Sequence, residues 1–144
     1  MADERELTDS PRDWVSQHAQ RYVETDGQEG HLWRGVPTLV LITTGRSSGK
    51  LRRTMLIYGQ DGDNYLLVAS QGGAPEHPQW YRNLVAQPEV RAQVLADRFA
   101  ARAHTATPEE KVRLWPTMAA IWPAFDEYRA RTTRAIPLVI LERV

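Results

Sequence analysis

Short apolar runs separated by turn-forming residues constrain the fold of this chain more than any other feature. Five runs have the length and composition of β-strands: residues 37–43, 51–58, 64–70, 89–95 and 99–106. Residues 136–141 form a further run that resembles a buried strand. Such strands, joined mainly by hairpins, indicate an antiparallel barrel or curled sheet rather than a parallel α/β sheet.

Two turn sequences, one tetrapeptide and one dipeptide, predict how these strands connect. Asp61-Gly62-Asp63-Asn64 is typical of a hairpin turn, so we expect the second and third strands to pair antiparallel. Asp97-Arg98 should make a similar turn between the fourth and fifth strands.

The N-terminal part of the chain predicts a mobile segment followed by a helix. Residues 1–9 are polar and we expect them to be mobile, ahead of a single domain over residues 10–144. Ser10 as N-cap and Pro11 at the first helical position predict a helix that runs to about Thr25.

Three further helices are expected among the strands. A short helix should cover about residues 78–86. Thr107-Pro108-Glu109-Glu110 has the residues of a capping box and predicts the start of a later helix. Pro116 should kink or break that helix, and a shorter one should follow Pro123.

Composition excludes several classes of function. The formal net charge is zero, so the chain shows no bias toward nucleic acid, and the absence of cysteine excludes disulfides, thiol nucleophiles and cysteine metal sites. The 4 histidines have no ligand spacing, so we expect no metal site. There is no signal-peptide pattern and no apolar run near the roughly 18 residues of a membrane span. We therefore expect a soluble, cytoplasmic protein, with peripheral membrane contact and oligomeric state left open.

Two loops at strand ends carry the strongest chemical signals. The first holds the basic residues Arg46, Lys50, Arg52 and Arg53 among small residues, and the second is the turn at residues 70–73. Arginine and lysine suit phosphates and carboxylates, and small residues let a ligand approach the backbone. Together the loops predict a pocket for a flat cofactor with an anionic tail, although each alone is also compatible with a solvated turn.

The first loop is not a nucleotide-triphosphate loop. Only three residues separate Gly45 from Gly49, where that motif has four. Lys50 is followed by Leu51 rather than Ser or Thr, and the loop leads into a strand instead of a helix.

Several residues after the third strand have two interpretations each. Ser70 is no nucleophile elbow, but its hydroxyl could bind a heterocycle or satisfy its own turn. Trp80 and Leu84 favour a place in the core, whereas Arg82 and Asn83 could reach a ligand.

Trp122, Phe125 and Tyr128 are spaced by three residues and should share one face of a helix. They could pack in the core. They could instead form an aromatic wall over a flat ring, where each stacked pair contributes about 1 kcal/mol.

With these motifs the sequence resembles the deazaflavin-dependent nitroreductase family of bacterial oxidoreductases, which includes quinone reductases. The resemblance extends from about Trp14 to the C-terminus. The motifs that carry it are R-G-V-P at residues 34–37, T-T-G-R-S-S-G-K-L-R at 43–52, A-S-Q-G-G-A-P-E-H-P-Q-W-Y-R-N-L at 69–84 and R-x-I-P at 134–137.

The resemblance implies a split β-barrel of the mainly-β α+β class and the coenzyme F-420, a deazaflavin with a phospholactyl-oligoglutamate tail. It implies hydride transfer from the reduced coenzyme to a small electron-poor acceptor: a quinone, an activated enone or a nitroaromatic. The proton would come from water or from Tyr128. An FMN-binding split-barrel reductase and a deazaflavin carrier without turnover remain the alternatives.

The resemblance also assigns residues to three groups. The coenzyme tail would meet Arg46, Ser47, Ser48, Lys50, Arg52 and Arg53. The ring and ribityl chain would meet Thr54, Met55, Leu56, Ile57, Val68, Ala69, Ser70, Gln71, Gln79, Trp80, Tyr81, Arg82 and Asn83. The substrate pocket would be bordered by Trp122, Phe125 and Tyr128, with the first helix as a lid.

Three positions depart from the family pattern. Ser47 replaces a common lysine, which removes a charge from the tail site, and Met55 replaces a common proline beside the ring. Phe125 stands where some relatives have tyrosine, so a phenol is missing there.

Overall fold

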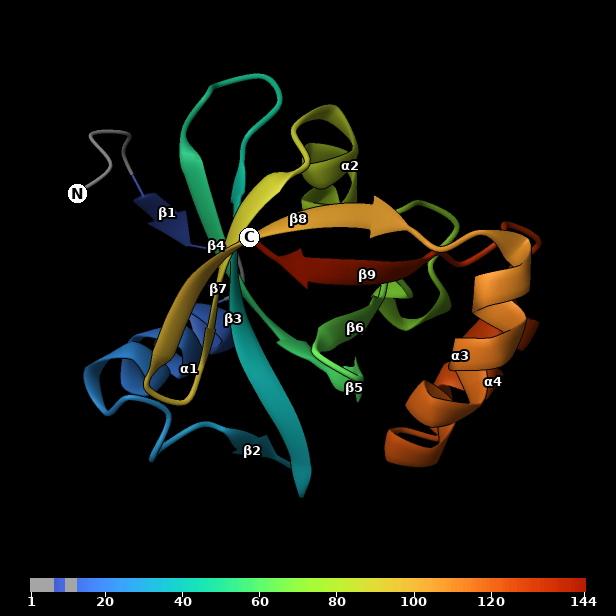
Figure 1. Cartoon of the computed structure of the whole chain (residues 1–144), viewed down its shortest axis with the longest axis horizontal. Helices are drawn as coiled ribbons and strands as arrows, with labels where there is room; N and C mark the ends of the chain where they lie inside the picture. Colours follow the sequence, from blue (N-terminus) through green and yellow to red (C-terminus); the bar gives the residue numbers. More distant parts are fainter. Residues whose placement is uncertain (1–6, 10–12) are drawn as a thin grey trace.

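The computed structural model of the chain describes residues 7–9 and 13–144, with side chains from residue 15 onward. Within this part of the chain, one sheet carries four α-helices and a short 3-10 turn (Figure 1). The strands are β1 (Leu7–Asp9), β2 (Leu32–Trp33), β3 (Val36–Thr44), β4 (Leu51–Ile57), β5 (Gly59–Asp61), β6 (Asn64–Val68), β7 (Glu89–Val94), β8 (Asp97–Thr105) and β9 (Leu138–Arg143). The helices are α1 (Asp13–Glu24), α2 (Gln79–Ala86), α3 (Pro108–Ile121) and α4 (Ala124–Arg131), and the 3-10 turn is η1 (Gln71–Gly73).

The order of the strands forces the sheet to curl. The order is β1-β4-β3-β7-β8-β9-β6-β5, with β2 paired to β3, and the β1–β4 pair alone is parallel among the described strands. Strands β4 and β5 lie near opposite ends of this order, although only Tyr58 separates them in the sequence. The strand order and this one-residue connection are compatible only if the two ends of the sheet approach each other. The result is the curled half-barrel in Figure 1.

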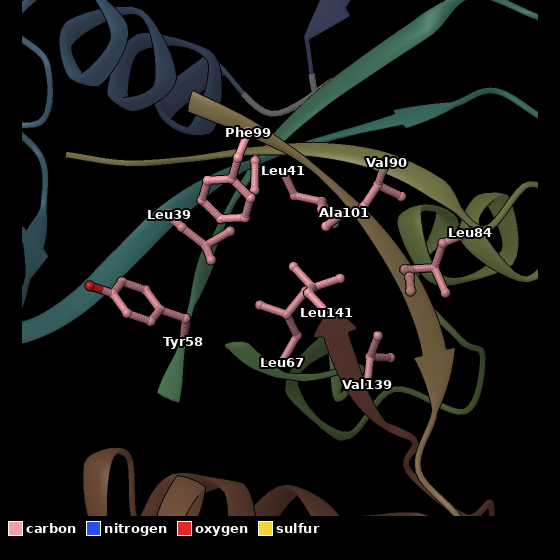
Figure 2. Packing of buried hydrophobic residues seen from close by; sticks show 12 residues of the cluster. Leu39, Leu41, Tyr58, Leu67, Leu84, Val90, Phe99, Ala101, Val139 and Leu141 are labelled. Atoms are coloured by element: carbon pink, nitrogen blue, oxygen red, sulfur yellow. The ribbon is translucent and has the colours of Figure 1, made fainter. Parts of the chain in front are cut away.

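The apolar runs pack into two cores because some strands are buried on both faces. Along β6, Leu67 points into the curled sheet, whereas Leu66 and Val68 point outward against α3 and α4. The inner core is drawn in Figure 2 and contains Leu39, Leu41, Tyr58, Leu67, Leu84, Val90, Ala92, Phe99, Ala101, Ala103, Val139 and Leu141. The outer core contains Leu66, Val68, Leu114, Trp115, Met118, Phe125, Ile136, Leu138 and Ile140.

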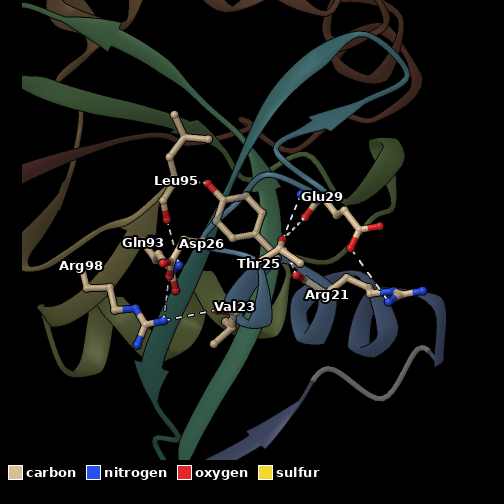
Figure 3. A network of polar contacts seen from close by, with 9 residues as sticks. Arg21, Val23, Thr25, Asp26, Glu29, Gln93, Leu95 and Arg98 are labelled. Carbon is tan, nitrogen blue, oxygen red and sulfur yellow. Dashed lines mark hydrogen bonds and ion pairs between the residues drawn. The ribbon is translucent and has the colours of Figure 1, made fainter.

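Helix α1 packs on β3 and β4 through one apolar face. Val15, Ala19 and Tyr22 are buried on this face. Figure 3 shows the polar contacts that tie the C-terminal end of the helix to the β7–β8 hairpin. Among them, Arg98 Nη2 lies 3.3 Å from the Asp26 carboxylate.

The turn expected at residues 97–98 lies two residues earlier, so that prediction is wrong. The register of β7 against β8 leaves residues 95–96 as the turn. Leu95 has a φ of +54°, and its N–H donates a 2.7 Å hydrogen bond to the Tyr22 hydroxyl. This contact with α1, which local turn propensity does not include, stabilises the position of the turn.

The predicted pairing of the second run, residues 51–58, with the third run, residues 64–70, is also wrong. Strand β4 pairs with β3 along its whole length, and the predicted hairpin turn joins β5 to β6 through the pair Asp61–Asn64. The chain bends after Tyr58, where Gly59 allows α3 to approach closely. A Cβ atom at Gly59 would lie 2.6 Å from Met118 Sδ.

Pro116 does not break α3, because the helix continues to Ile121; of the predicted kink or break, the break is excluded. Proline removes the hydrogen bond to the carbonyl of Val112. Val112 and Pro116 are both exposed, so water can replace that bond. The capping box is confirmed, because Thr107 Oγ1 accepts from the Glu110 N–H and the Glu110 carboxylate accepts from the Thr107 N–H.

The N-terminal expectations are only partly covered by the described residues. Residues 7–9 form β1 beside β4, within the segment expected to be mobile, and the predicted helix start at Ser10 and Pro11 lies outside the described residues. The single domain over residues 10–144 stays a prediction.

Helix α4 lies directly against η1, and Gly73 makes this approach possible. A Cβ atom at Gly73 would lie 2.9 Å from the Tyr128 carbonyl oxygen and 3.1 Å from its Cα atom. The neighbouring Gly72 also has a positive φ, yet a Cβ atom there would meet nothing within 4 Å. The two glycines therefore differ in steric surroundings but share the left-handed backbone.

Gly73→Ala should destabilise the protein more than Gly72→Ala. Both alanines adopt a left-handed backbone at a cost of about 1–2 kcal/mol, and only Gly73→Ala adds an overpacking cost of about 1–3 kcal/mol against α4. Urea unfolding of both variants measures the difference. Equal losses in the free energy of unfolding would show that α4 does not pack on η1 as described.

Candidate active site

A cavity of about 870 Å³ opens between β4, the end of β6 and the helices. Its walls come from β3, β4, the loop between them, β6, η1, α2, α4 and Trp122 just before α4. Helix α1 adds Val15 and His18, and β2 adds Trp33. The two loops that the sequence singles out thus face one space, as predicted from their chemistry.

The basic loop between β3 and β4 is closed by its own backbone. The Gly45 N–H donates to the Lys50 carbonyl at 2.7 Å, and the Gly49 N–H donates to the Gly45 carbonyl at 2.9 Å. A Cβ atom at Gly45 would lie 2.8 Å from Ser48 Oγ, so the tight loop needs glycine there. This geometry presents Arg46, Ser47 and Ser48 to the cavity.

Arg46 is held in place by neutral side chains of α2. Its Nη1 donates to Asn83 Oδ1 at 2.9 Å, and its Nη2 donates to Gln79 Oε1 at 2.7 Å. Asn83 is only 4% exposed, and its Nδ2 donates to Thr43 Oγ1 at 3.3 Å. Because amides carry no charge, these bonds orient the Arg46 guanidinium beside the cavity without forming an ion pair with it.

Strand β4 offers the cavity both side chains and an uncovered backbone edge. All six residues from Arg52 to Ile57 line the cavity. Within the described residues, β1 pairs only with residues 51–53, so no strand ladder covers that edge of β4 from Thr54 to Ile57. Such an edge presents N–H and C=O groups that a planar heterocycle with amide-like atoms can pair with.

The turn after β6 has an unusual backbone. Gln71, Gly72 and Gly73 have φ values of +47°, +63° and +82°. A non-glycine residue in the left-handed region costs about 1–2 kcal/mol, so the surrounding contacts must stabilise Gln71 there. Ser70, Gln71 and Gly72 all line the cavity.

Aromatic side chains form the wall opposite the basic loop. Trp122, Phe125 and Tyr128 line the cavity. Phe125 is also part of the outer core, so this residue both packs in the core and contributes to the wall. Trp33 completes the wall, with its ring centroid 5.3 Å from that of Trp122. Trp122 Nε1 donates to the Tyr128 hydroxyl at 3.4 Å, which leaves the phenol proton available to an acceptor in the cavity.

Most of the residues predicted to contact the coenzyme or the substrate line the cavity, and several lining residues were not predicted. Of the predicted coenzyme residues, Lys50, Ala69, Tyr81 and Arg82 do not line the cavity, whereas Trp80 both lines it and packs on the inner core. Lys50 is exposed at the start of β4, and Ala69 is completely buried. The Tyr81 hydroxyl instead bonds Thr105 Oγ1 on β8 at 2.8 Å.

The missed lining residues are Val15, His18, Trp33, Thr38, Thr43, Gly45, Gly72 and Pro78. His18 had a usable signal, since it lies three residues after Val15 and four before Tyr22 on the predicted first helix. Its Nε2 is 2.5 Å from the Gly30 carbonyl oxygen. Trp33 lacked one, because the two-residue strand that carries it is too short to show a period.

Two further classes of site are not supported by the described part of the chain. No group of three or more His, Cys, Asp or Glu residues within it could hold a metal ion. Among its helices, none combines the length and hydropathy that crossing a bilayer requires.

Comparisons with known proteins agree with this geometry. Residues 14–143 match the model of the F420H(2)-dependent quinone reductase family. The chain is 40% identical over 135 residues to an F420H(2)-dependent quinone reductase of Mycobacterium tuberculosis (strain ATCC 25618 / H37Rv), which covers 88% of this chain and 87% of the relative.

Two solved structures share the fold at 36% identity. A domain-swapped dimer superposes with a TM-score of 0.71 over 92% of this chain and 100% of its own. An F420-H2 dependent reductase superposes with a TM-score of 0.69 over 74% of this chain and 94% of its own. The expected split β-barrel and the expected cofactor, coenzyme F-420, are thereby confirmed. The chain belongs to the F420H(2)-dependent quinone reductase family.

Proposed function

We propose that this protein transfers hydride from reduced coenzyme F-420, held along β4, to a quinone-type acceptor held against the aromatic wall. The single observation that carries the proposal is one cavity with two chemically different ends. At one end lies the Arg46 guanidinium, oriented by amides, and at the other lie Trp33, Trp122 and Tyr128. Activated enones and nitroaromatics are acceptors of the same electron-poor class.

The basic end fits the anionic tail of the coenzyme. Arg46, Ser47, Ser48 and Arg52 line the cavity there and offer donors suited to phosphate and carboxylate oxygens. Lys50 is exposed outside the lining, so it would meet only a part of the tail that leaves the cavity. Ser47, where relatives often carry lysine, supplies a hydroxyl donor without a charge.

The middle of the cavity fits the deazaflavin ring. The uncovered edge of β4 at residues 54–57, Ser70 and Gln71 supply polar groups along the cavity. When bound, coenzyme F-420 supplies a hydride in a two-electron step. The protein residues contribute position, because a near-attack arrangement of donor and acceptor accounts for much of the barrier reduction in such reactions.

The aromatic wall would orient the acceptor and keep water away. Trp33 and Trp122 lie far apart in the sequence but side by side in this wall, so a planar acceptor could lie against either ring. The Tyr128 hydroxyl, which already accepts from Trp122, would donate to the acceptor oxygen as charge develops there, with water as the alternative proton source. Peripheral membrane contact belongs to this proposal for lipid-soluble quinones, and the exposed Leu32 beside Trp33 supports it.

The experiment that tests the proposal has two arms. Binding of oxidised F-420 and of FMN is compared by fluorescence, and consumption of reduced F-420 is then followed with and without a soluble quinone. We expect tight binding of F-420, weak binding of FMN and quinone-dependent turnover. Preference for FMN would point to a flavin reductase, and F-420 binding without turnover would point to a carrier.

Arg46→Ala should weaken coenzyme binding about tenfold or more, because a charge-assisted hydrogen bond contributes roughly 1.5–3 kcal/mol. The fold should survive, since the Arg46 N–H keeps its own bond to Asn83 Oδ1 at 3.2 Å. Fluorescence titration at two salt concentrations measures the effect, and affinity of the parent protein should fall as salt rises. Arg102→Ala is the matched control, since that side chain is 69% exposed on β8 and paired with Glu89. Equal affinities of both variants would remove Arg46 from the coenzyme site.

Tyr128→Phe should lower kcat by about tenfold or more while coenzyme affinity stays the same, because proton donation acts in the transition state. Steady-state kinetics with a quinone and a separate coenzyme titration measure the two effects. Tyr65→Phe is the control, because Tyr65 packs on Phe99 in the inner core and does not line the cavity. If Tyr128→Phe turns over like the parent protein, the proton comes from water.

A further inference from the structure

Arg134, the first residue of the R-x-I-P motif at residues 134–137, has no part in the proposed function as described above. The Arg134 guanidinium donates hydrogen bonds to the carbonyls of Ala69, Ser70 and Ala74 at 3.2, 2.6 and 2.8 Å. Its Nη1 also lies 2.9 Å from His77 Nδ1. One side chain therefore binds the end of β6, both sides of η1 and the segment that leads into α2.

These four acceptors lie on either side of η1, the turn at residues 71–73, whose backbone conformation is unfavourable. Residues 71–73 are all left-handed, and Gln71 adopts this conformation without the freedom of glycine. The turn has two backbone bonds of its own, from the Gly73 N–H to the Ser70 carbonyl and from the Ala74 N–H to the Gln71 carbonyl. Arg134 donates to the same Ser70 carbonyl, which belongs to a turn whose residues Ser70 and Gln71 line the cavity.

We propose that Arg134 is a positioning residue for the reaction: it fixes the Ser70–Gly73 turn and the start of α2 in the arrangement that the coenzyme ring requires. This inference rests on the proposed function. Only a planar group with donors in several directions can bind four acceptors at once, so the role belongs to a guanidinium and not to an ammonium.

His77 makes the arrangement sensitive to pH. Since arginine only donates, His77 Nδ1 must be unprotonated to accept from Arg134. Burial, followed by the charges of Arg134 and Arg82, lowers the pKa of His77. The other titratable groups near the imidazole are Tyr81, whose ring centroid lies 5.0 Å away, and Glu76, the preceding residue.

The sign of the effect follows from the direction of this pKa change. A lowered pKa in the folded state means that the unfolded chain binds the proton more strongly. The contribution of His77 is therefore complete above its ordinary pKa of about 6.5, and it is lost as the pH falls through the lower folded value. Protonation would place an imidazolium against the guanidinium and remove the fourth bond.

The test compares Arg134→Lys with Arg113→Lys, a control whose guanidinium binds Asp61 on the exposed side of α3. Amide exchange at Gly73 and Ala74 is measured in the coenzyme-free protein, and F-420 affinity is measured by fluorescence. We expect Arg134→Lys to raise both exchange rates and the F-420 Kd by about tenfold, and Arg113→Lys to change neither. Parent-like exchange and affinity in Arg134→Lys would overturn the inference.

A second variant keeps the test decisive if Arg134→Lys does not fold. His77→Asn places an acceptor oxygen near the Nδ1 position without a titrating group. Between pH 7.5 and 5, exchange protection at Gly73 and F-420 affinity should fall more in the parent than in His77→Asn. Titration of the coenzyme itself cancels in this comparison, and identical pH profiles would overturn the inference. If the parent protein does not bind F-420 at all, the proposed function fails. If it binds normally and these variants match it, only the role of Arg134 fails.

Discussion

A single residue, Tyr58, separates strands that lie near opposite ends of the sheet, and this constraint determines most of the architecture. Strand β4 must remain paired with β3 while β5 pairs with β6, so the sheet has to curl until both conditions are met. Tyr58 is anchored accordingly: its N–H donates to the Pro37 carbonyl, and its buried hydroxyl contacts His31 Nε2 at 2.9 Å. Burial raises the pKa of Tyr58 to about 12, so the phenol remains neutral in this position.

Within the described residues, the curled sheet leaves the edge of β4 at residues 54–57 without a strand partner, and these residues line the cavity. The loops at its borders are held by different hydrogen bonds. The β3–β4 loop is closed by its own backbone bonds, whereas the turn after β6 depends on a distant arginine. Helix α4 touches that same turn at Gly73, so the turn after β6 and the helix that carries Phe125 and Tyr128 are in direct contact beside the cavity.

The sequence predicted strands, helices and the basic loop because these depend on local patterns. The apolar runs matched β3, β4, β6, β7, β8 and β9, and the capping residues of α3 are in the expected place. The errors concern tertiary contacts. The β7–β8 turn is selected by Tyr22 on α1, and β4 keeps β3 as its partner because the chain bends at Tyr58. Trp33 could not be predicted as a wall residue, because its place depends on contact with Trp122, 89 positions along the chain.

The amide cradle of Arg46 has a consequence for the kinetics and selectivity of binding. Holding an arginine in one rotamer costs about 1.5–2 kcal/mol of side-chain entropy, and here Asn83 and Gln79 impose that loss during folding rather than at the encounter with a ligand. A cation that is already immobile recognises anions quickly, but it does so without regard to their identity. Free phosphate would occupy the same guanidinium, so buffer anions, and not ionic strength alone, would set the apparent occupancy of the site.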